Sequence, residues 1–231
     1  MKIKVCGMRD AHNVSEVERL GVDMVGFIFS RQSKRYVSML PSMSGTVPNY
    51  VSSTQMQGSC LSGMAGRHAA ARVGVFVDDM PQNIVTAVYG YGLDYIQLHG
   101  NESPVMIDNL RRTIDPDIRP GIKIIKALSV ESAADICRWR EYAGHADLLL
   151  FDTKGKEKGG NGIHFDWSLL DTYDGDVPFI LSGGIGPEDA EAVKSFSHPS
   201  FWGIDLNSRF ELQPALKDVG KLEKFISELR N

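Results

Sequence analysis

The chain has 231 residues, of which 42% are hydrophobic and 23% are charged, and its formal net charge is −4 at pH 7. These values are typical of a folded globular protein and exclude a largely disordered or collagen-like chain. The acidic excess argues against a surface devoted to nucleic acid or anionic lipid, and no apolar run approaches the roughly 18 residues that cross a bilayer. Only three cysteines are present, and no signal-peptide pattern opens the sequence, so we expect a cytoplasmic protein with reduced thiols.

Eight short runs of apolar and β-branched residues predict β-strands. In chain order they are Ile3–Cys6, Met24–Phe29, Val73–Val77, Tyr95–Leu98, Ile122–Lys126, Asp147–Asp152, Phe179–Ser182 and Trp202–Asp205. Several of them, such as Val25–Phe29, are apolar without interruption. This pattern is typical of parallel strands that are buried on both faces.

Helix signals separate the strands. The predicted helices are one capped by Asp10 that runs to Leu20, one from Pro81 to about Tyr89, one that begins at Ser103-Pro104, one around Glu131–Tyr142, one from Pro187 through Lys194, and one over Lys217–Leu229. Eight strands with their connections predict an α/β fold, a single-domain (βα)8 TIM barrel of parallel strands over residues 1–231. An open doubly wound sheet is disfavoured, because no GxGxxG loop follows the first strand.

One segment departs from this alternation. The 30 residues from Val37 to Gly66 carry no charge, and their helical periodicity is weak. We therefore expect an irregular loop insertion over residues 37–71, between the second and third strands. A functional lid is the alternative interpretation.

In a (βα)8 barrel the functional side chains lie at the carboxyl ends of the strands. The candidates at these positions are Cys6, Arg35, His99, Lys126 and Asp152. If the strand faces that carry them point inward, a thiol, an imidazole, an ammonium and a carboxylate meet at one mouth. Each has a structural alternative: a small buried residue for Cys6, a surface charge for Arg35, a packed or hydrogen-bonding side chain for His99, and an ion-pair partner for Lys126. Asp152 could cap or brace Thr153 and Lys154.

The loops after the seventh and eighth predicted strands indicate an anion site. Ser182-Gly183-Gly184-Ile185-Gly186-Pro187 offers unobstructed backbone amides just before a predicted helix, and barrels commonly bind phosphate at these two loops. The residues expected to take part are Gly183, Gly184, Asn207 and Ser208. A tight turn that simply requires glycine is the alternative.

An ordered set of motifs extends over nearly the whole chain outside residues 41–72. The motifs are Lys4-Val5-Cys6-Gly7-Met8, Ser33-Lys34-Arg35-Tyr36, Val73-Gly74-Val75-Phe76-Val77, Gln97-Leu98-His99-Gly100, Ile125-Lys126-Ala127, Phe151-Asp152-Thr153-Lys154, Gly159-Gly160 through Phe165-Asp166-Trp167, and Leu181-Ser182-Gly183-Gly184. Together they resemble the phosphoribosylanthranilate isomerase family. One departure is Leu206-Asn207-Ser208-Arg209 after the eighth strand, where the family often has Val-Ser-Ser-Gly.

The resemblance implies an Amadori rearrangement of N-(5-phosphoribosyl)anthranilate to 1-(2-carboxyphenylamino)-1-deoxyribulose 5-phosphate, a step of tryptophan biosynthesis. It implies that Cys6 is the general base and Asp152 the general acid, and that Arg35 meets the anthranilate end of the substrate. His99 and Lys126 are expected to contact substrate, and the glycine pair with the loop after the eighth strand is expected to hold the phosphate. No metal or organic cofactor is expected, because the substrate nitrogen is the electron sink.

The ionisation of the thiol is the difficulty in this scheme. A free thiol is only about 3% ionised at pH 7, and half ionisation requires about 2 kcal/mol of stabilisation. The expected sources are Lys4, one step deeper on the same face of the strand, and the helix N-termini around the mouth of the barrel.

Three alternatives remain. Lys126 suits a Schiff-base aldolase or an indole-forming lyase. A related sugar-phosphate isomerase with an imidazole substrate would be expected to have a carboxylate in place of Cys6. A non-catalytic sugar-phosphate binder is the third alternative. We expect a phosphorylated small molecule as the partner, neither nucleic acid nor membrane, and a monomer or small homo-oligomer.

Overall fold

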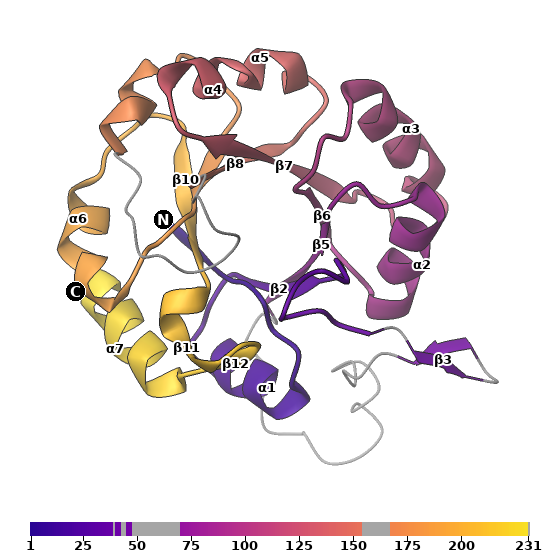
Figure 1. Ribbon diagram of the computed structural model, residues 1–231, viewed down its shortest axis with the longest axis horizontal. Helices are drawn as coiled ribbons and strands as arrows, with labels where there is room; N and C mark the ends of the chain where they lie inside the picture. The colour runs from indigo at the N-terminus through magenta and orange to yellow at the C-terminus, as the bar shows by residue number, and fades with distance from the viewer. Residues whose placement is uncertain (39, 43–44, 48–69, 154–166, 231) are drawn as a thin grey trace.

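A computed structural model describes the chain except for residues 39, 43–44, 48–69, 154–166 and 231. Eight parallel strands form a closed barrel in the order β1-β10-β9-β8-β7-β6-β5-β2, and helices surround it (Figure 1). The barrel strands are β1 (Lys2–Val5), β2 (Met24–Ile28), β5 (Ala71–Phe76), β6 (Tyr95–Leu98), β7 (Lys123–Val130), β8 (Leu148–Thr153), β9 (Phe179–Leu181) and β10 (Phe201–Leu206). The predicted α/β barrel and its eight strands are confirmed.

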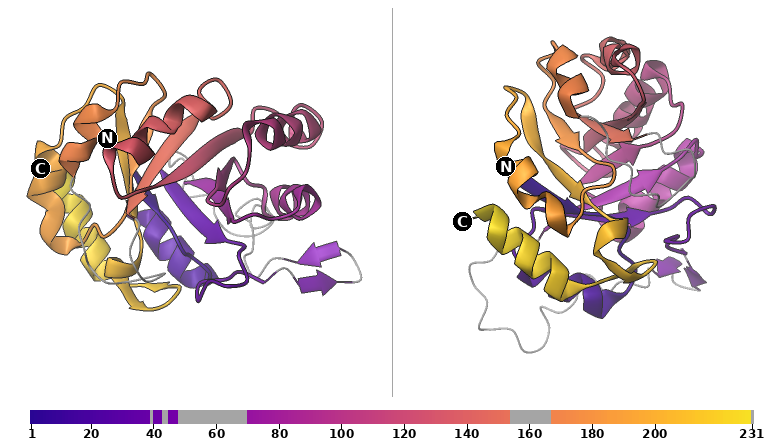
Figure 2. Two further views of the ribbon diagram at one scale, coloured as in Figure 1. Left: turned by 45° about the horizontal axis from the view of Figure 1, so that its top comes forward. Right: turned by 60° about the vertical axis from the view of Figure 1, so that its left-hand side comes forward.

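The helices follow the strands on the outside of the barrel (Figure 2). They are α1 (Ala11–Arg19), α2 (Pro81–Tyr91), α3 (Pro104–Ile114), α4 (Ala133–Cys137), α5 (Trp139–Tyr142), α6 (Ala190–Ser195) and α7 (Val219–Arg230), with short 3-10 turns η2 (Trp167–Thr172), η3 (Pro187–Asp189) and η4 (Ser208–Phe210). Asp10 caps α1 by accepting from Asn13 N at 2.8 Å, and Ser103 caps α3 in the same way through Met106 N. Among the described residues, no helix is long and apolar enough to cross a bilayer.

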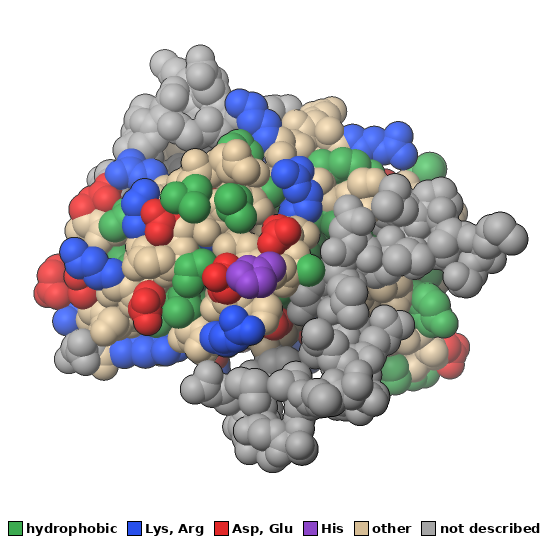
Figure 3. Space-filling view, turned by 90° about the horizontal axis from the view of Figure 1, so that it is seen from below, with side chains coloured by type: hydrophobic (Ala, Val, Ile, Leu, Met, Phe, Trp, Pro, Cys, Tyr) green, Lys and Arg blue, Asp and Glu red, His purple; other side chains and the backbone are tan. Residues whose placement is uncertain are grey.

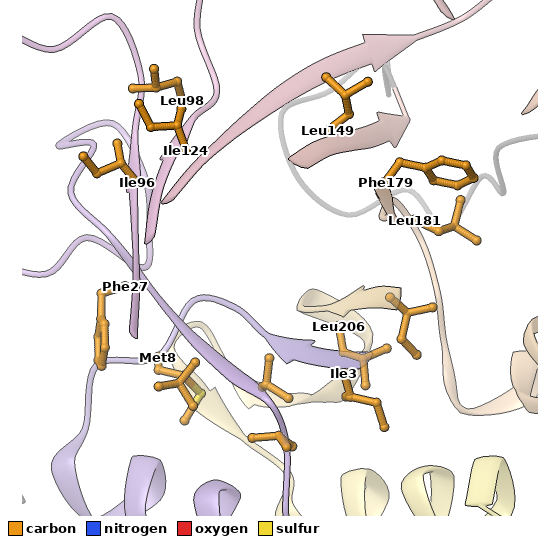
Figure 4. Packing of buried hydrophobic residues seen from close by; sticks show 14 of the residues in the cluster. Ile3, Met8, Phe27, Ile96, Leu98, Ile124, Leu149, Phe179, Leu181 and Leu206 are labelled. Atoms are coloured by element: carbon orange, nitrogen blue, oxygen red, sulfur yellow. The ribbon is translucent and has the colours of Figure 1, made fainter. Parts of the chain in front are cut away.

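Two layers of apolar side chains follow from the alternation of the strands. The larger layer lies between barrel and helices and includes Phe27, Ile124 and Leu149 (Figure 4). The smaller layer fills the barrel interior and consists of Met24, Val73, Ile125, Ala127, Leu148, Leu150 and Ile180. Successive residues of β7, Ile124 and Ile125, thus belong to different layers, and this register decides which polar side chains enter the site.

Several predicted boundaries are wrong. β7 pairs with β8 as far as Val130↔Thr153, so the strand continues past Lys126, and the helix expected over Glu131–Tyr142 is instead the two short helices α4 and α5, separated at Arg138. The helix expected to begin at Pro187 opens with the 3-10 turn η3 before α6. Lys217 does not begin the last helix. It belongs to β12 (Leu216–Lys217), which forms a small antiparallel hairpin with β11 (Glu211–Gln213).

Most of the insertion expected over residues 37–71, and with it the possible lid, lies outside the described residues. Within that range the structure describes the antiparallel pair β3 (Leu40–Ser42) and β4 (Gly45–Val47). This hairpin extends away from the barrel wall (Figure 1). The barrel resumes at Ala71, which pairs with Met24 of β2.

Candidate active site

Cys6 stands at the carboxyl end of β1. Its backbone N–H donates to Leu206 O of β10 at 2.9 Å. Ile3 and Val5 belong to the outer layer, so Lys4 and Cys6 are on the face that points into the barrel. Gly26 of β2 leaves room for the thiol, since a Cβ atom there would lie 2.8 Å from Cys6 Sγ. The residue is only 3% exposed.

A buried ion pair lies one step below the thiol. Lys4 is fully buried, and its Nζ is 2.9 Å from Oδ1 of Asp205 on β10. The other carboxylate oxygen of Asp205 accepts from Ser182 Oγ at 3.4 Å. The pair places a cation and an anion close to Cys6 in a water-poor interior, where both act strongly on its ionisation.

The pKa of Cys6 is raised above its ordinary value. Burial of the thiol is the main cause, and the negative charge of Asp205 adds to it, while the charges of Lys4 and Lys217 act in the opposite direction. For Lys4, burial alone lowers the pKa, but the opposing effects of Asp205 and the Cys6 thiolate leave it raised. Burial thus favours the neutral form of the thiol, and the charge of Lys4 opposes this effect.

Asp152 is the last but one residue of β8, on the same face as Leu148 and Leu150 of the inner layer. Its Oδ2 lies 3.3 Å from His99 Nε2, and each side chain is 27% exposed. Gln97 Nε2 is 3.0 Å from Nδ1 of the same imidazole. Nδ1 is thus the ring nitrogen that faces Gln97, and Nε2 is the one that faces Asp152. The structure thus joins His99 and Asp152, as expected, and adds Gln97, which is 1% exposed.

Arg35, in the loop after β2, is held by an ion pair at the mouth of the barrel. Its Nε and Nη2 donate to the two carboxylate oxygens of Glu211 at 2.8 and 2.6 Å. Lys217 Nζ donates to Glu211 Oε1 and to Asn207 Oδ1, each at 2.8 Å. The alternative of a freely solvated Arg35 is wrong, since its side chain is 17% exposed and doubly bonded.

Lys126 is not at the mouth of the barrel, and the expectation that it points inward is wrong. It alternates with Ile125 and Ala127 of the inner layer, so it faces the helix layer. Its Nζ donates to Gly100 O at 2.7 Å and to Glu102 Oε2 at 2.8 Å, and its side chain is 1% exposed. The ion-pair alternative from the sequence describes this residue, and the geometry opposes a role as Schiff-base amine.

The two loops expected to hold phosphate are adjacent. Gly183 and Gly184 have φ values of 90° and 75°, which favour glycine. Asn207 and Ser208 follow β10, and an ion pair between Arg209 and Glu188 ties this loop to the segment after β9. The side-chain oxygen of Asn207 is occupied by Lys217, so its amide nitrogen and the backbone amides are the groups left for an anion.

Sequence reasoning missed three residues of this end of the barrel: Gln97, Glu211 and Lys217. Gln97 belongs to the Gln97-Leu98-His99-Gly100 motif, but nothing in the sequence indicates its contact with the imidazole. The helical pattern that follows Lys217 predicts a helix that begins there. The one available signal was Pro214, three residues earlier, which is typical of a turn and argues against a helix that begins nearby.

Charges are mixed on the face shown in Figure 3. Lysine and arginine side chains alternate there with aspartate and glutamate, and the described residues of this face form no continuous basic patch. This distribution does not favour a polyanion bound along this face.

A closed (βα)8 barrel with polar side chains gathered at the carboxyl ends of its strands has the architecture of a barrel enzyme. Comparison with known proteins gives the family. The family model described as N-(5'-phosphoribosyl)anthranilate (PRA) isomerase matches residues 3–228, and the chain belongs to this family. Its activity is therefore the isomerisation of N-(5'-phosphoribosyl)anthranilate in tryptophan biosynthesis.

Individual relatives agree. The N-(5'-phosphoribosyl)anthranilate isomerase of Parabacteroides distasonis is 42% identical over 229 residues, which cover 99% of this chain and 93% of the relative. That of Phocaeicola vulgatus is 37% identical and covers 100% of this chain and 98% of the relative. Among solved structures, the phosphoribosyl anthranilate isomerase of Thermus thermophilus superposes with a TM-score of 0.74 at 25% identity, covering 100% of this chain and 98% of the other.

Proposed function

We propose that Cys6 and Asp152 carry out the rearrangement as general base and general acid. The supporting observation is that both side chains lie on the inward face at the carboxyl end of the barrel, with the buried Lys4–Asp205 pair beneath the thiol. A solved phosphoribosyl anthranilate isomerase, 26% identical over the whole chain with a TM-score of 0.71, is in complex with reduced 1-(o-carboxyphenylamino)-1-deoxyribulose 5-phosphate. We infer that the same end of this barrel receives the substrate.

Ring opening and enol formation each require one proton transfer, and two more give the ketone. Protonated Asp152 gives its proton to the ring oxygen of the ribose while the nitrogen lone pair forms a C1=N bond and the C1–O bond breaks. The Cys6 thiolate then removes the proton from C2. The C2–H electrons form a C1=C2 bond, and the nitrogen regains its lone pair. Loss of the enol proton and protonation of C1 give the ketone.

The neighbours of each group suit these roles. Lys4 stabilises the thiolate against the burial that disfavours it. Because His99 Nε2 lies 3.3 Å from Asp152 Oδ2, the imidazole can hold the carboxyl group in place at the mouth of the barrel. His99 therefore acts on the general acid, in addition to any contact with substrate. Lys126 is omitted from this mechanism because it faces the helix layer.

The substrate has two anionic ends, and the site has two places for them. We assign the anthranilate carboxylate to Arg35, which lies beside the backbone that follows Cys6. We assign the phosphate to the amides of Gly183, Gly184, Asn207 and Ser208, whose loops are tied together by the Arg209–Glu188 pair.

The decisive experiment removes each proton-transfer group in turn. Cys6→Ser and Asp152→Asn should each lower kcat by at least about 100-fold, since one positioned acid or base contributes 10²–10⁴-fold. Turnover is followed by the loss of anthranilate-type fluorescence from freshly prepared N-(5'-phosphoribosyl)anthranilate. Cys137→Ser is the matched control, because Cys137 is exposed on α4, and it should retain full activity.

Substrate binding is the companion measurement. Both variants should still bind the product analogue with affinity close to that of the unsubstituted protein. Near-normal turnover of Cys6→Ser would remove the thiol as the base, and near-normal turnover of Asp152→Asn would remove the carboxyl as the acid.

We further propose one domain over residues 1–231, a cytoplasmic location and a monomer or small homo-oligomer. A thiol base must stay reduced, which supports a reducing compartment. A relative from Thermotoga maritima, 26% identical, is described as a dimer from which monomers were generated. Sedimentation of the purified chain tests the oligomeric state.

A further inference from the structure

Glu211 is a buried carboxylate with two cationic partners. Its side chain is 5% exposed, that of Arg35 is 17% exposed, and that of Lys217 is fully buried. The Glu211 carboxylate also accepts from the backbone N–H of Ala215 at 3.2 Å, which fixes it to its own hairpin. The β11–β12 hairpin therefore places the carboxylate of Glu211 at the mouth of the barrel.

The contact with Arg35 uses one particular edge of the guanidinium. Nε and Nη2 point to Oε1 and Oε2 of Glu211, a bidentate pair. A guanidinium has a second edge, formed by Nη1 and the other Nη2 proton, that can bind a carboxylate in the same way. Within the described part of the chain, Nη1 has no hydrogen-bond partner. Glu211 thus fixes the side chain while it leaves one fork of donors available.

The clamped arginine lies close to the proposed base. A Cβ atom on Gly7, the residue after Cys6, would lie 2.5 Å from Arg35 Cδ and 2.7 Å from Asn207 Oδ1. Gly7 has a φ of 77°, which glycine adopts easily. The side chain of Arg35 therefore crosses the backbone next to the thiol, where only a glycine fits.

We propose that Glu211 is a positioning residue that presents the Nη1–Nη2 edge of Arg35 to the ortho carboxylate of the substrate. Lys217 supports it by balancing the charge of Glu211 and by holding Asn207 in the next loop. The inference rests on the proposed role of Arg35 and deepens it. The substrate preference of the enzyme for an aromatic amine with a carboxylate thus depends on the Arg35–Glu211 ion pair, which joins the loop after β2 to the hairpin after β10.

A double-mutant cycle on KM tests the proposal. Arg35→Ala should raise KM at least about 10-fold, as expected for a lost charged hydrogen bond to the substrate. Glu211→Gln keeps the shape but cannot accept at both oxygens, so Arg35 must be ordered when substrate binds. Immobilising one such side chain corresponds to a rise of about 2- to 12-fold in KM, with kcat within about 2-fold of the original.

The effects of the two substitutions on KM should not be additive. If Glu211 acts through Arg35, Glu211→Gln should change KM by less than about 2-fold in the Arg35→Ala background. Glu191→Gln is the matched control, because Glu191 is exposed and its carboxylate pairs with Lys194 on α6 at 3.2 Å. That variant should leave KM and kcat unchanged.

The two possible failures are distinguishable. An unchanged KM in Arg35→Ala would overturn the role of Arg35 itself. A raised KM in Arg35→Ala together with an unchanged KM in Glu211→Gln, or with additive effects, would overturn the inference alone.

If Glu211→Gln does not fold, Arg35→Lys tests the bidentate pair by changing the arginine instead of the glutamate. Lysine keeps the positive charge but cannot form the bidentate pair. It should raise KM by about 2- to 12-fold, and a KM equal to that of the original protein would overturn the proposal.

Discussion

Replacing Lys126 by methionine separates its structural role from a catalytic one. In the folded protein Lys126 is paired with Glu102, whose side chain is 2% exposed. Breaking a buried pair costs about 3–5 kcal/mol, because the remaining charge is left without its partner. Glu102 still accepts from the backbone N–H groups of Asp78 and Gly100 at 3.0 Å, so we expect the lower end, about 3 kcal/mol.

For a chain of this length such a loss corresponds to a decrease of about 6–12 °C in the thermal midpoint. The midpoint is measured by circular dichroism, and kcat and KM are measured at 25 °C on the folded protein. Both constants should remain within about 5-fold of the original values, because Lys126 faces the helix layer.

Lys123→Met is the matched control. Lys123 is on the same strand, but its side chain is 53% exposed and its bond to Asp147 is 3.3 Å long. An exposed pair of this kind contributes at most about 1 kcal/mol. A Lys126→Met protein with an unchanged midpoint and a lost kcat would contradict the outward orientation and revive the lyase alternative.

Two further changes probe the thiol. Lys4→Met removes the ammonium that lowers the pKa of Cys6 and leaves burial and Asp205 to raise that pKa further. Since the base is the thiolate, kcat/KM rises with pH below this pKa, and the rising limb of the pH profile should move to higher pH. An unmoved limb would show that Lys4 does not act on the thiol. Gly26→Ala introduces a Cβ 2.8 Å from Cys6 Sγ. It should displace the thiol, lower kcat at least about 10-fold and cost about 1–3 kcal/mol of stability. The control is Gly90→Ala in α2, where a Cβ meets nothing within 4 Å; it should raise the stability by about 0.5–1 kcal/mol and leave kcat unchanged.

The sequence was sufficient for the barrel because the signal for each strand is local. A continuous apolar run such as that of β8 indicates a strand buried on both faces, and eight predicted strands with helical patterns between them favour a closed parallel barrel. The motif order then led to Cys6, Asp152 and Arg35, which are all on strand ends or in the loops that follow them.

The wrong or missing predictions have a common physical cause, because each of these features depends on contacts between segments that are distant in the sequence. Lys126 was expected to end its strand, but the strand continues because β8 offers partners as far as Val130. That pairing gives no local signal. Glu211 gave no signal either, since its role exists only through Arg35, 176 residues away in the chain.

The charges around Cys6 explain why an additional carboxylate is useful there. Lys4 and Asp205 neutralise each other, and Lys217 neutralises Glu211. Arg35 is then the one positive charge in excess within this group of five. Two anions compete for it, the thiolate and the substrate carboxylate. Glu211 holds the Nε–Nη2 edge of Arg35. The Nη1–Nη2 edge then binds the substrate carboxylate, and Lys4 stabilises the thiolate. A site without Glu211 would have two surplus cations at its mouth, one of them fully buried, and could not keep these two roles apart.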